Sequence, residues 1–128
     1  SNFLKDAGVS IISTNHISPS GSADATKVEV SDSGRIYYNV TSNTYFATVF
    51  IKSGTFSHFK MGTSQVNLIS GTVSSGTIEP LANGWYRIGY PYTGTRPFQI
   101  QAYPDANYTT HTDSGDYYIW GAQVETAL

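Results

Sequence analysis

The side chains with the clearest chemical potential in this sequence are aromatic rings and amides that alternate with apolar residues along strand-like segments. Successive side chains of a β-strand point to opposite faces, so alternation separates a core face from an outer face. The faces turned away from the expected core carry Phe46, Thr48, Phe50, Trp85, Arg87, Gln99, Gln101 and Tyr103. Aromatic rings can stack on the apolar faces of sugars, and amide, hydroxyl and guanidinium groups can hydrogen-bond sugar hydroxyls. If these strands share one sheet, their outer face has the chemistry of a carbohydrate-binding surface.

We predict from this pattern a ligand-binding site made of strand residues with help from one loop. Its members are Phe50, Arg87, Gln99, Gln101 and Tyr103, with Tyr108 and His111 from the loop 104–115. The alternative is that loops or a neighbouring subunit cover this face. The ten Tyr residues do not distinguish these alternatives, because Tyr suits both the core of a sandwich and a ligand-binding surface.

Residues for catalysis show no recognisable arrangement. A glycosidase needs two carboxylates roughly 5–10 Å apart across the scissile bond. The acids here lie mostly in turns, and Glu79 and Glu125, in predicted strands, have no obvious partner. The three His residues are scattered, and the Gly-x-Ser-x-Gly elbow of serine hydrolases is absent. We therefore expect a protein that is not an enzyme.

The amino-acid composition argues against several other classes of function. A net charge of −2 leaves no basic field to neutralise phosphates, so nucleic-acid binding is not expected. No apolar run approaches the ~20 residues of a membrane span and no signal peptide is visible, so membrane insertion is not expected either. Without cysteine there is no thiolate metal site, no transition-metal spacing is present, and no cofactor is expected.

The candidate site is expected to lie on strands, since helical periodicity is almost absent. One helical turn over 22–26 is the exception. Segments rich in β-branched and aromatic residues, separated by Gly, Ser, Asp and Asn turns, predict about ten short strands. These are expected at 8–13, 26–31, 35–40, 44–52, 56–61, 66–73, 76–81, 84–92, 97–103 and 116–125.

The order of several motifs resembles a known family of domains. A Pro-Gly turn at 18–21 precedes the strand start Ala25-Thr26-Lys27-Val28, and a long strand at 44–52 runs into Ser53-Gly54. The phrase Asn83-Gly84-Trp85-Tyr86-Arg87-Ile88 and the C-terminal run 118–125, Tyr-Ile-Trp-Gly-Ala-Gln-Val-Glu, follow. In this combination the chain is similar to the carbohydrate-binding-module-like jelly-roll domains of bacteriophage tail-fibre and other virion proteins.

The resemblance implies one all-β domain over residues 1–128, an antiparallel β-sandwich of jelly-roll type with its core between about residues 8 and 125. It implies that Trp85 and Trp120 pack in the core or between the sheets. Related sandwiches often hold a structural Ca²⁺, and the candidate oxygen ligands here are Asp6, Asp24, Asp113, Asp116 and Glu125. Turn formation is the alternative role of these acids.

The function implied is non-catalytic adhesion to host surface polysaccharide by a virion appendage, a tail fibre or a capsid decoration. The expected location is the virion surface, outside the cell. Weak sites would be multiplied by repeated copies, as in a homotrimer of the parent protein. The alternative is a structural, decoration or assembly domain that binds other virion proteins and no glycan. The uncharged, Tyr-rich surface suits such interfaces as well.

Overall fold

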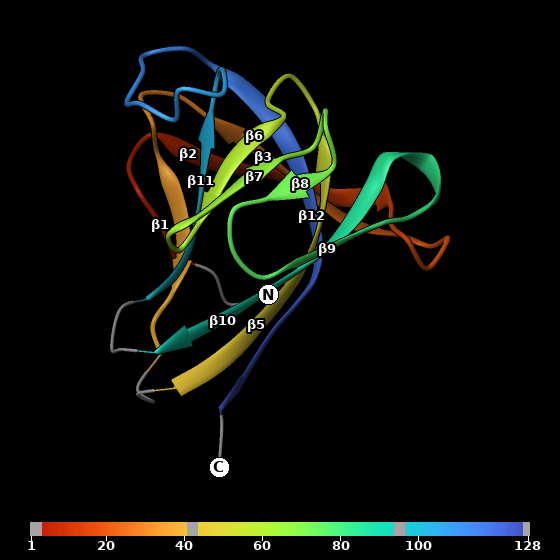
Figure 1. Cartoon of the computed structure of the whole chain (residues 1–128). Helices are drawn as coiled ribbons and strands as arrows, with labels where there is room; N and C mark the ends of the chain where they lie inside the picture. Colours follow the sequence, from red (N-terminus) through yellow and green to blue (C-terminus); the bar gives the residue numbers. More distant parts are fainter. Residues whose placement is uncertain (1–3, 41–43, 94–96, 127–128) are drawn as a thin grey trace.

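The computed structural model describes residues 4–40, 44–93 and 97–126, and most of these residues lie in two antiparallel sheets packed face to face (Figure 1). Sheet A contains, in spatial order, β1 (Leu4–Lys5), β4 (Arg35–Tyr38), β11 (Phe98–Tyr103), β6 (His58–Met61), β7 (Ser64–Asn67) and β8 (Thr72–Val73). Sheet B contains β2 (Val9–Ile17), β3 (Ala23–Val30), β12 (Gly115–Thr126), β5 (Thr44–Ser53), β10 (Trp85–Thr93) and β9 (Thr77–Pro80). A 3-10 turn, η1 (Ala82–Gly84), precedes β10. Across the described ranges, no helix has the length and apolar character needed to cross a membrane.

The chain repeatedly passes from one sheet to the other. Crossings follow β1, β3, β4, β5, β8, β10 and β11. As a result the central neighbours β12 and β5, or β11 and β6, are far apart in sequence. This winding confirms the predicted all-β, antiparallel sandwich of jelly-roll type.

The core between the sheets follows the predicted alternation. On β5, Tyr45, Ala47, Val49 and Ile51 are buried and point inward. On β11, Phe98, Ile100 and Ala102 do the same from sheet A. The rings of Phe59 and Tyr117 meet edge to face across the core, with centroids 4.9 Å apart. Burial of these side chains on both inner faces is the main force that holds the sheets together.

Two local predictions were wrong. Residues 22–26, expected as a helical turn, lie mostly in β3, where their backbone pairs with β2. The expected strand 66–73 is split into β7 and β8, because Asn67 forms a side-chain turn. Its Oδ1 accepts hydrogen bonds from the backbone N–H groups of Ile69 (2.9 Å) and Ser70 (3.1 Å). An Asn side chain that bonds the backbone two residues on competes with strand pairing in this way.

A β-bulge in β12 decides which way the C-terminal aromatic residues point. The pairing with β5 moves from Trp120 opposite Phe50 to Gln123 opposite Thr48, so β12 holds one extra residue. Gly121 lies there with a φ of +63°, a conformation that favours glycine. Before the bulge Ile119 faces the core and Trp120 faces out, whereas after it Val124 stands opposite the inward Ala47. The expectation that Trp120 packs in the core is therefore wrong, because one inserted residue reverses the alternation.

The loop between β11 and β12 is anchored to sheet A. The Tyr108 hydroxyl donates to the Val66 carbonyl at 3.0 Å. His111 Nε2 lies 2.9 Å from the Ala102 carbonyl oxygen, so this nitrogen carries the proton of the bond. The Tyr103 ring packs edge to face against both Tyr108 and His111. The loop thus closes over the end of β11.

Candidate ligand-binding face

The predicted site residues are divided between the two sheets. Phe50 and Arg87 are direct neighbours on β5 and β10 of sheet B. Gln99, Gln101 and Tyr103 lie on β11 of sheet A. The premise that all these strands share one sheet is wrong, because alternation along a strand identifies its outer side chains but not the sheet to which the strand belongs.

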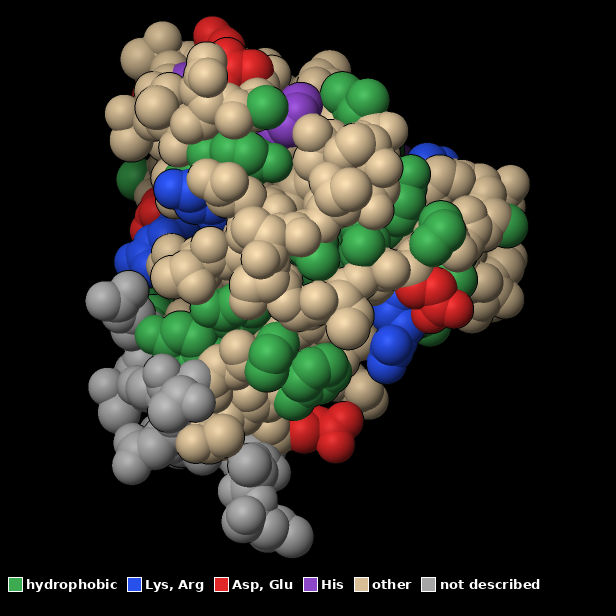
Figure 2. All heavy atoms as spheres, viewed as in Figure 1, with side chains coloured by type: hydrophobic (Ala, Val, Ile, Leu, Met, Phe, Trp, Pro, Cys, Tyr) green, Lys and Arg blue, Asp and Glu red, His purple; other side chains and the backbone are tan. Residues whose placement is uncertain are grey.

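On sheet A, the two predicted amides are engaged within the protein. Gln99 Oε1 accepts a hydrogen bond from the Arg35 guanidinium, and Arg35 is also paired with Asp6 at 3.2 Å. Gln101 Nε2 donates to the Ser33 carbonyl at 2.6 Å. These bonds connect β11 to β4 and to the segment before it. Figure 2 shows few charged side chains on the face that carries β6, β7 and β8, with hydrophobic ones in small groups.

The aromatic and loop members of the predicted site are largely inaccessible. Tyr103 is 4% exposed and Tyr108 is 9% exposed, and burial raises the pKa of both phenols. His111 packs against Phe56 and holds the loop through its bond to Ala102. Tyr103, Tyr108 and His111 therefore form a small core of their own beneath the loop.

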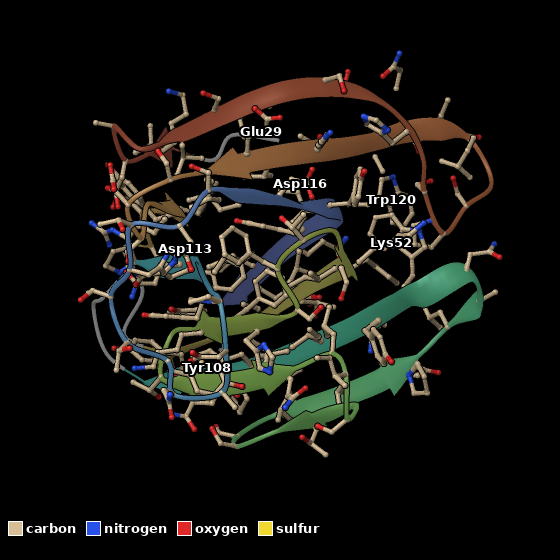
Figure 3. All side chains as sticks on the ribbon, turned by 90° about the horizontal axis from the view of Figure 1, so that it is seen from above. Glu29, Lys52, Tyr108, Asp113, Asp116 and Trp120 are labelled. Carbon is tan, nitrogen blue, oxygen red and sulfur yellow. The ribbon has the colours of Figure 1, made fainter. Side chains whose placement is uncertain are left out.

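The outer face of sheet B gathers several accessible aromatic residues instead. Phe50 lies between Arg87 on β10 and Trp120 on β12, and its ring meets that of Trp120 edge to face with centroids 5.1 Å apart. The next row along the sheet places Lys52 beside Tyr118, with Lys52 Nζ 5.9 Å from the centroid of the Tyr118 ring. In Figure 3, Trp120 and Lys52 lie together between the β2–β3 pair and the β9–β10 pair.

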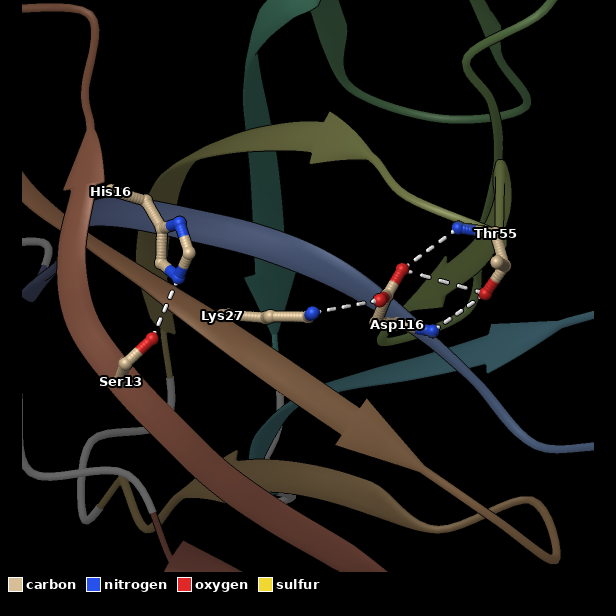
Figure 4. Close-up of polar contacts among 5 residues, drawn as sticks. All are labelled: Ser13, His16, Lys27, Thr55 and Asp116. Carbon is tan, nitrogen blue, oxygen red and sulfur yellow. Dashed lines mark hydrogen bonds and ion pairs between the residues drawn. The ribbon is translucent and has the colours of Figure 1, made fainter.

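His16 completes this group on the β2 side. Its ring meets Tyr118 edge to face at 5.1 Å, and its Nε2 lies 2.6 Å from Ser13 Oγ (Figure 4). We define the aromatic face as His16, Phe50, Lys52, Arg87, Tyr118 and Trp120. Five of these side chains are half-buried and Arg87 is exposed, so their rings are packed at the edges yet open to solvent.

The sequence positions these rings through two local features. A Cβ on Gly121 would lie only 3.1 Å from Phe50 Cδ1, so the bulge glycine leaves the space in which the Phe50 ring rests. Trp85 stands opposite Lys52 on the same side of the sheet. It is 2% exposed and is not part of the core cluster between the sheets, so it forms a buried support beside the aromatic face.

Sequence reasoning missed Tyr118, Trp120, Lys52 and His16. For the first two, a signal was present, since a glycine inside a strand pattern often marks a bulge. Gly121 follows Trp120 directly, and a bulge there reverses the faces on either side. Nothing in the sequence places His16 beside Tyr118, because that contact depends on the order of β2, β3 and β12 in the sheet.

The charges near the aromatic face are partly neutralised at one end. Lys27 Nζ lies 3.3 Å from Asp116 Oδ2, and this hydrogen bond raises the pKa of Lys27. Asp116 also accepts from the Thr55 backbone N–H at 2.9 Å (Figure 4). In the described part of the chain, neither Lys52 nor Arg87 forms an ion pair.

The acids considered as calcium ligands do not gather in one place within the described ranges. Asp6 is bound to Arg35 on sheet A, whereas Asp116 is bound to Lys27 and Thr55 on sheet B. No group of three or more His, Cys, Asp or Glu residues among the described positions has the arrangement to hold a metal ion. The structural calcium site thus gains no support from the geometry.

No protein-family model matches the chain, and the curated proteins contain no match to its sequence.

Proposed function

We propose that this protein is a non-catalytic carbohydrate-binding domain of a phage virion appendage, which adheres to host surface glycans through its aromatic face. The observation that carries the proposal is the cluster of Phe50, Tyr118 and Trp120 on the solvent side of sheet B, next to Lys52 and Arg87. Sugar rings stack on such aromatic groups, while the cationic side chains donate hydrogen bonds to hydroxyls or acidic substituents.

The assignment to a phage particle has a separate basis. It rests on the resemblance of the ordered motifs between residues 8 and 125 to virion jelly-roll domains. A shallow, open face suits weak binding at each copy, which an appendage with several copies converts into strong adhesion. Host polysaccharide is then the partner, and the virion surface is the location.

The test is glycan binding by the purified domain, displayed on multivalent particles against bacterial polysaccharides and host cells. We expect specific binding that is lost on Trp120→Ala, because this change removes the ring that packs against Phe50. The matched control is Tyr38→Ala, which removes an exposed ring from sheet A. Loss of binding in the control but not in Trp120→Ala would move the site to sheet A. Circular dichroism checks that both variants fold.

A second function, a structural or decoration domain without a glycan ligand, is favoured by exposed hydrophobic side chains that are not members of the aromatic face. Ile69 is 74% exposed and Ile17 is 58% exposed. Contacts with other virion proteins would cover such side chains. This function predicts no glycan binding under multivalent display, and defective virion assembly after Ile69→Ser and Ile17→Ser.

A further inference from the structure

We infer that the aromatic face selects an acidic polysaccharide, whose sugar units carry a carboxylate, sulfate or phosphate group. The inference rests on the proposed function, because it names the class of glycan that the same face binds. It follows from the two cationic members of the face, Lys52 and Arg87.

These cations stand out in a chain that is short of positive charge. The chain has seven Lys and Arg residues against nine Asp and Glu residues. The ion pairs of the described residues join Lys27 to Asp116 and Arg35 to Asp6. Lys52 and Arg87 have no such partner in the described ranges, although both lie on the face with the accessible aromatic rings.

The register places the two cations within reach of one bound sugar unit. Lys52 pairs with Trp85 and Arg87 pairs with Phe50, so Lys52 and Arg87 are diagonal neighbours on the same side of sheet B. Diagonal neighbours of this kind are roughly 7–8 Å apart. A sugar ring stacked on Phe50 or Trp120 therefore has a guanidinium on one side and an ammonium nearby.

The environment of Lys52 favours an anion over a neutral hydroxyl. The side chain is half-buried and its Nζ lies over the Tyr118 ring at 5.9 Å. Partial removal of an ammonium from water is unfavourable, and an aromatic ring compensates for only part of that loss. An anionic substituent compensates for the rest of the lost solvation by pairing with the ammonium. Its hydrogen bonds with charged donors are about twice as strong as neutral ones.

The acids of the outer face lie at its margins. Glu79 stands opposite Arg87 on the edge strand β9, and its side chain is exposed. Asp116 and Glu29 are paired in the ladder beyond Lys27, and Asp116 is engaged by Lys27. His16, next to Tyr118, adds no acid to this part of the face. The centre of the aromatic face is consequently its most cationic part.

The experiment compares one polyuronate with the neutral polymer made from it by reduction of the carboxyl groups, both as immobilised ligands. Sulfated dextran and a glycerol-phosphate polymer identify which anion is preferred. We expect at least one anionic polymer to bind about tenfold more tightly than the neutral one, since a charged hydrogen bond contributes about that factor. This preference should shrink as salt rises.

Two charge-removing variants locate the effect. Lys52→Gln and Arg87→Gln should each abolish most of the preference for the anionic polymer while the domain still binds the neutral one weakly. Lys60→Gln is the matched control, because Lys60 also lies near a ring, that of Tyr103, but on sheet A. An unchanged preference in both site variants, or loss of the preference in Lys60→Gln, would overturn the inference.

The two proposals fail in different ways. Equal binding of anionic and neutral polymers that is lost on Trp120→Ala would retain the carbohydrate-binding function and refute the acidic preference. Absence of binding to every polymer and to host cells would refute the carbohydrate-binding function itself, and the inference with it.

Discussion

Replacement of Gly121 by alanine tests the link between the β-bulge and the aromatic face. Gly121 has a φ of +63°, in the left-handed region that L residues avoid. It is also the position at which β12 gains one residue relative to β5, which turns Trp120 toward solvent. The added methyl group would change both the backbone energy and the space beneath the Phe50 ring.

The expected loss of stability has two contributions, one from the backbone conformation and one from the contact with Phe50. A left-handed backbone costs an alanine about 1 kcal/mol more than a glycine. The new Cβ would lie 3.1 Å from Phe50 Cδ1 and 3.3 Å from Cε1, closer than an ordinary van der Waals contact. Phe50 is half-buried and can move by a few tenths of an ångström, so the contact should add less than about 1 kcal/mol. We expect the free energy of unfolding to fall by about 1–2 kcal/mol in total.

Gly21→Ala is the matched control. Gly21 lies in the turn between β2 and β3 with a φ of +89°, and a Cβ there would have no heavy atom within 4 Å. It therefore measures the backbone cost alone. Urea denaturation gives both stabilities, and near-ultraviolet circular dichroism reports the packing of Phe50 against Trp120.

We expect Gly121→Ala to lose more stability than Gly21→Ala and to change the aromatic signal, which Gly21→Ala should leave intact. Glycan binding should weaken only in Gly121→Ala. If Gly121→Ala were as stable as the parent protein while Gly21→Ala lost stability, the bulge would not require glycine.

Three further predictions concern the core and the strand faces. Tyr117→Phe should raise the free energy of unfolding in urea by about 1–2 kcal/mol, because the buried hydroxyl has no hydrogen-bond partner among the described residues; a loss of stability would show that the hydroxyl is satisfied. Burial, with smaller effects of neighbouring tyrosines, raises the pKa of Tyr45 to about 12, against about 10 in the unfolded chain. Since the folded pKa is the higher, this stabilisation is complete below about pH 10 and is lost as the pH rises toward 12. Tyr45→Phe should therefore reduce the decrease of the urea midpoint between about pH 10 and pH 12. An unchanged dependence of the midpoint on pH would contradict this role of Tyr45. Finally, Ile100→Asp should abolish folding by burying a charge, whereas Gln101→Asp should keep the fold and lose only the bond to Ser33; reversed sensitivities, seen by circular dichroism, would contradict the assigned faces.

The candidate site could be predicted only in part. Phe50 and Arg87 were identified from their position on the outer sides of two strands, and the register of β5 and β10 makes them neighbours. Gln99 and Gln101 were equally well placed by alternation, yet β11 lies in the opposite sheet. A polar outer side chain looks the same in the sequence whether it meets a ligand or bonds to the next strand.

Trp120 illustrates the opposite error. The resemblance to virion jelly-roll domains implied a position in the core or between the sheets, but the bulge at Gly121 leaves Trp120 on the outer face. The alternation of side chains between the two faces is a local property of a strand. A single inserted residue therefore moves every later side chain to the opposite face. Whether a glycine is such an insertion depends on the partner strand, which the local pattern does not contain.

The fold class, most turn positions and the inner faces of strands such as 44–52 and 97–103 follow from the sequence alone, because they depend on local alternation and turn chemistry. Tertiary packing alone establishes which strands are neighbours, that the 104–114 loop closes over Tyr103, and that Trp120 and Tyr118 join Phe50 on sheet B. Strand pairing is decided by the combined energy of contacts between segments far apart in the chain. No single segment therefore specifies its partner strand, and the aromatic face exists only because β5, β10 and β12 are paired.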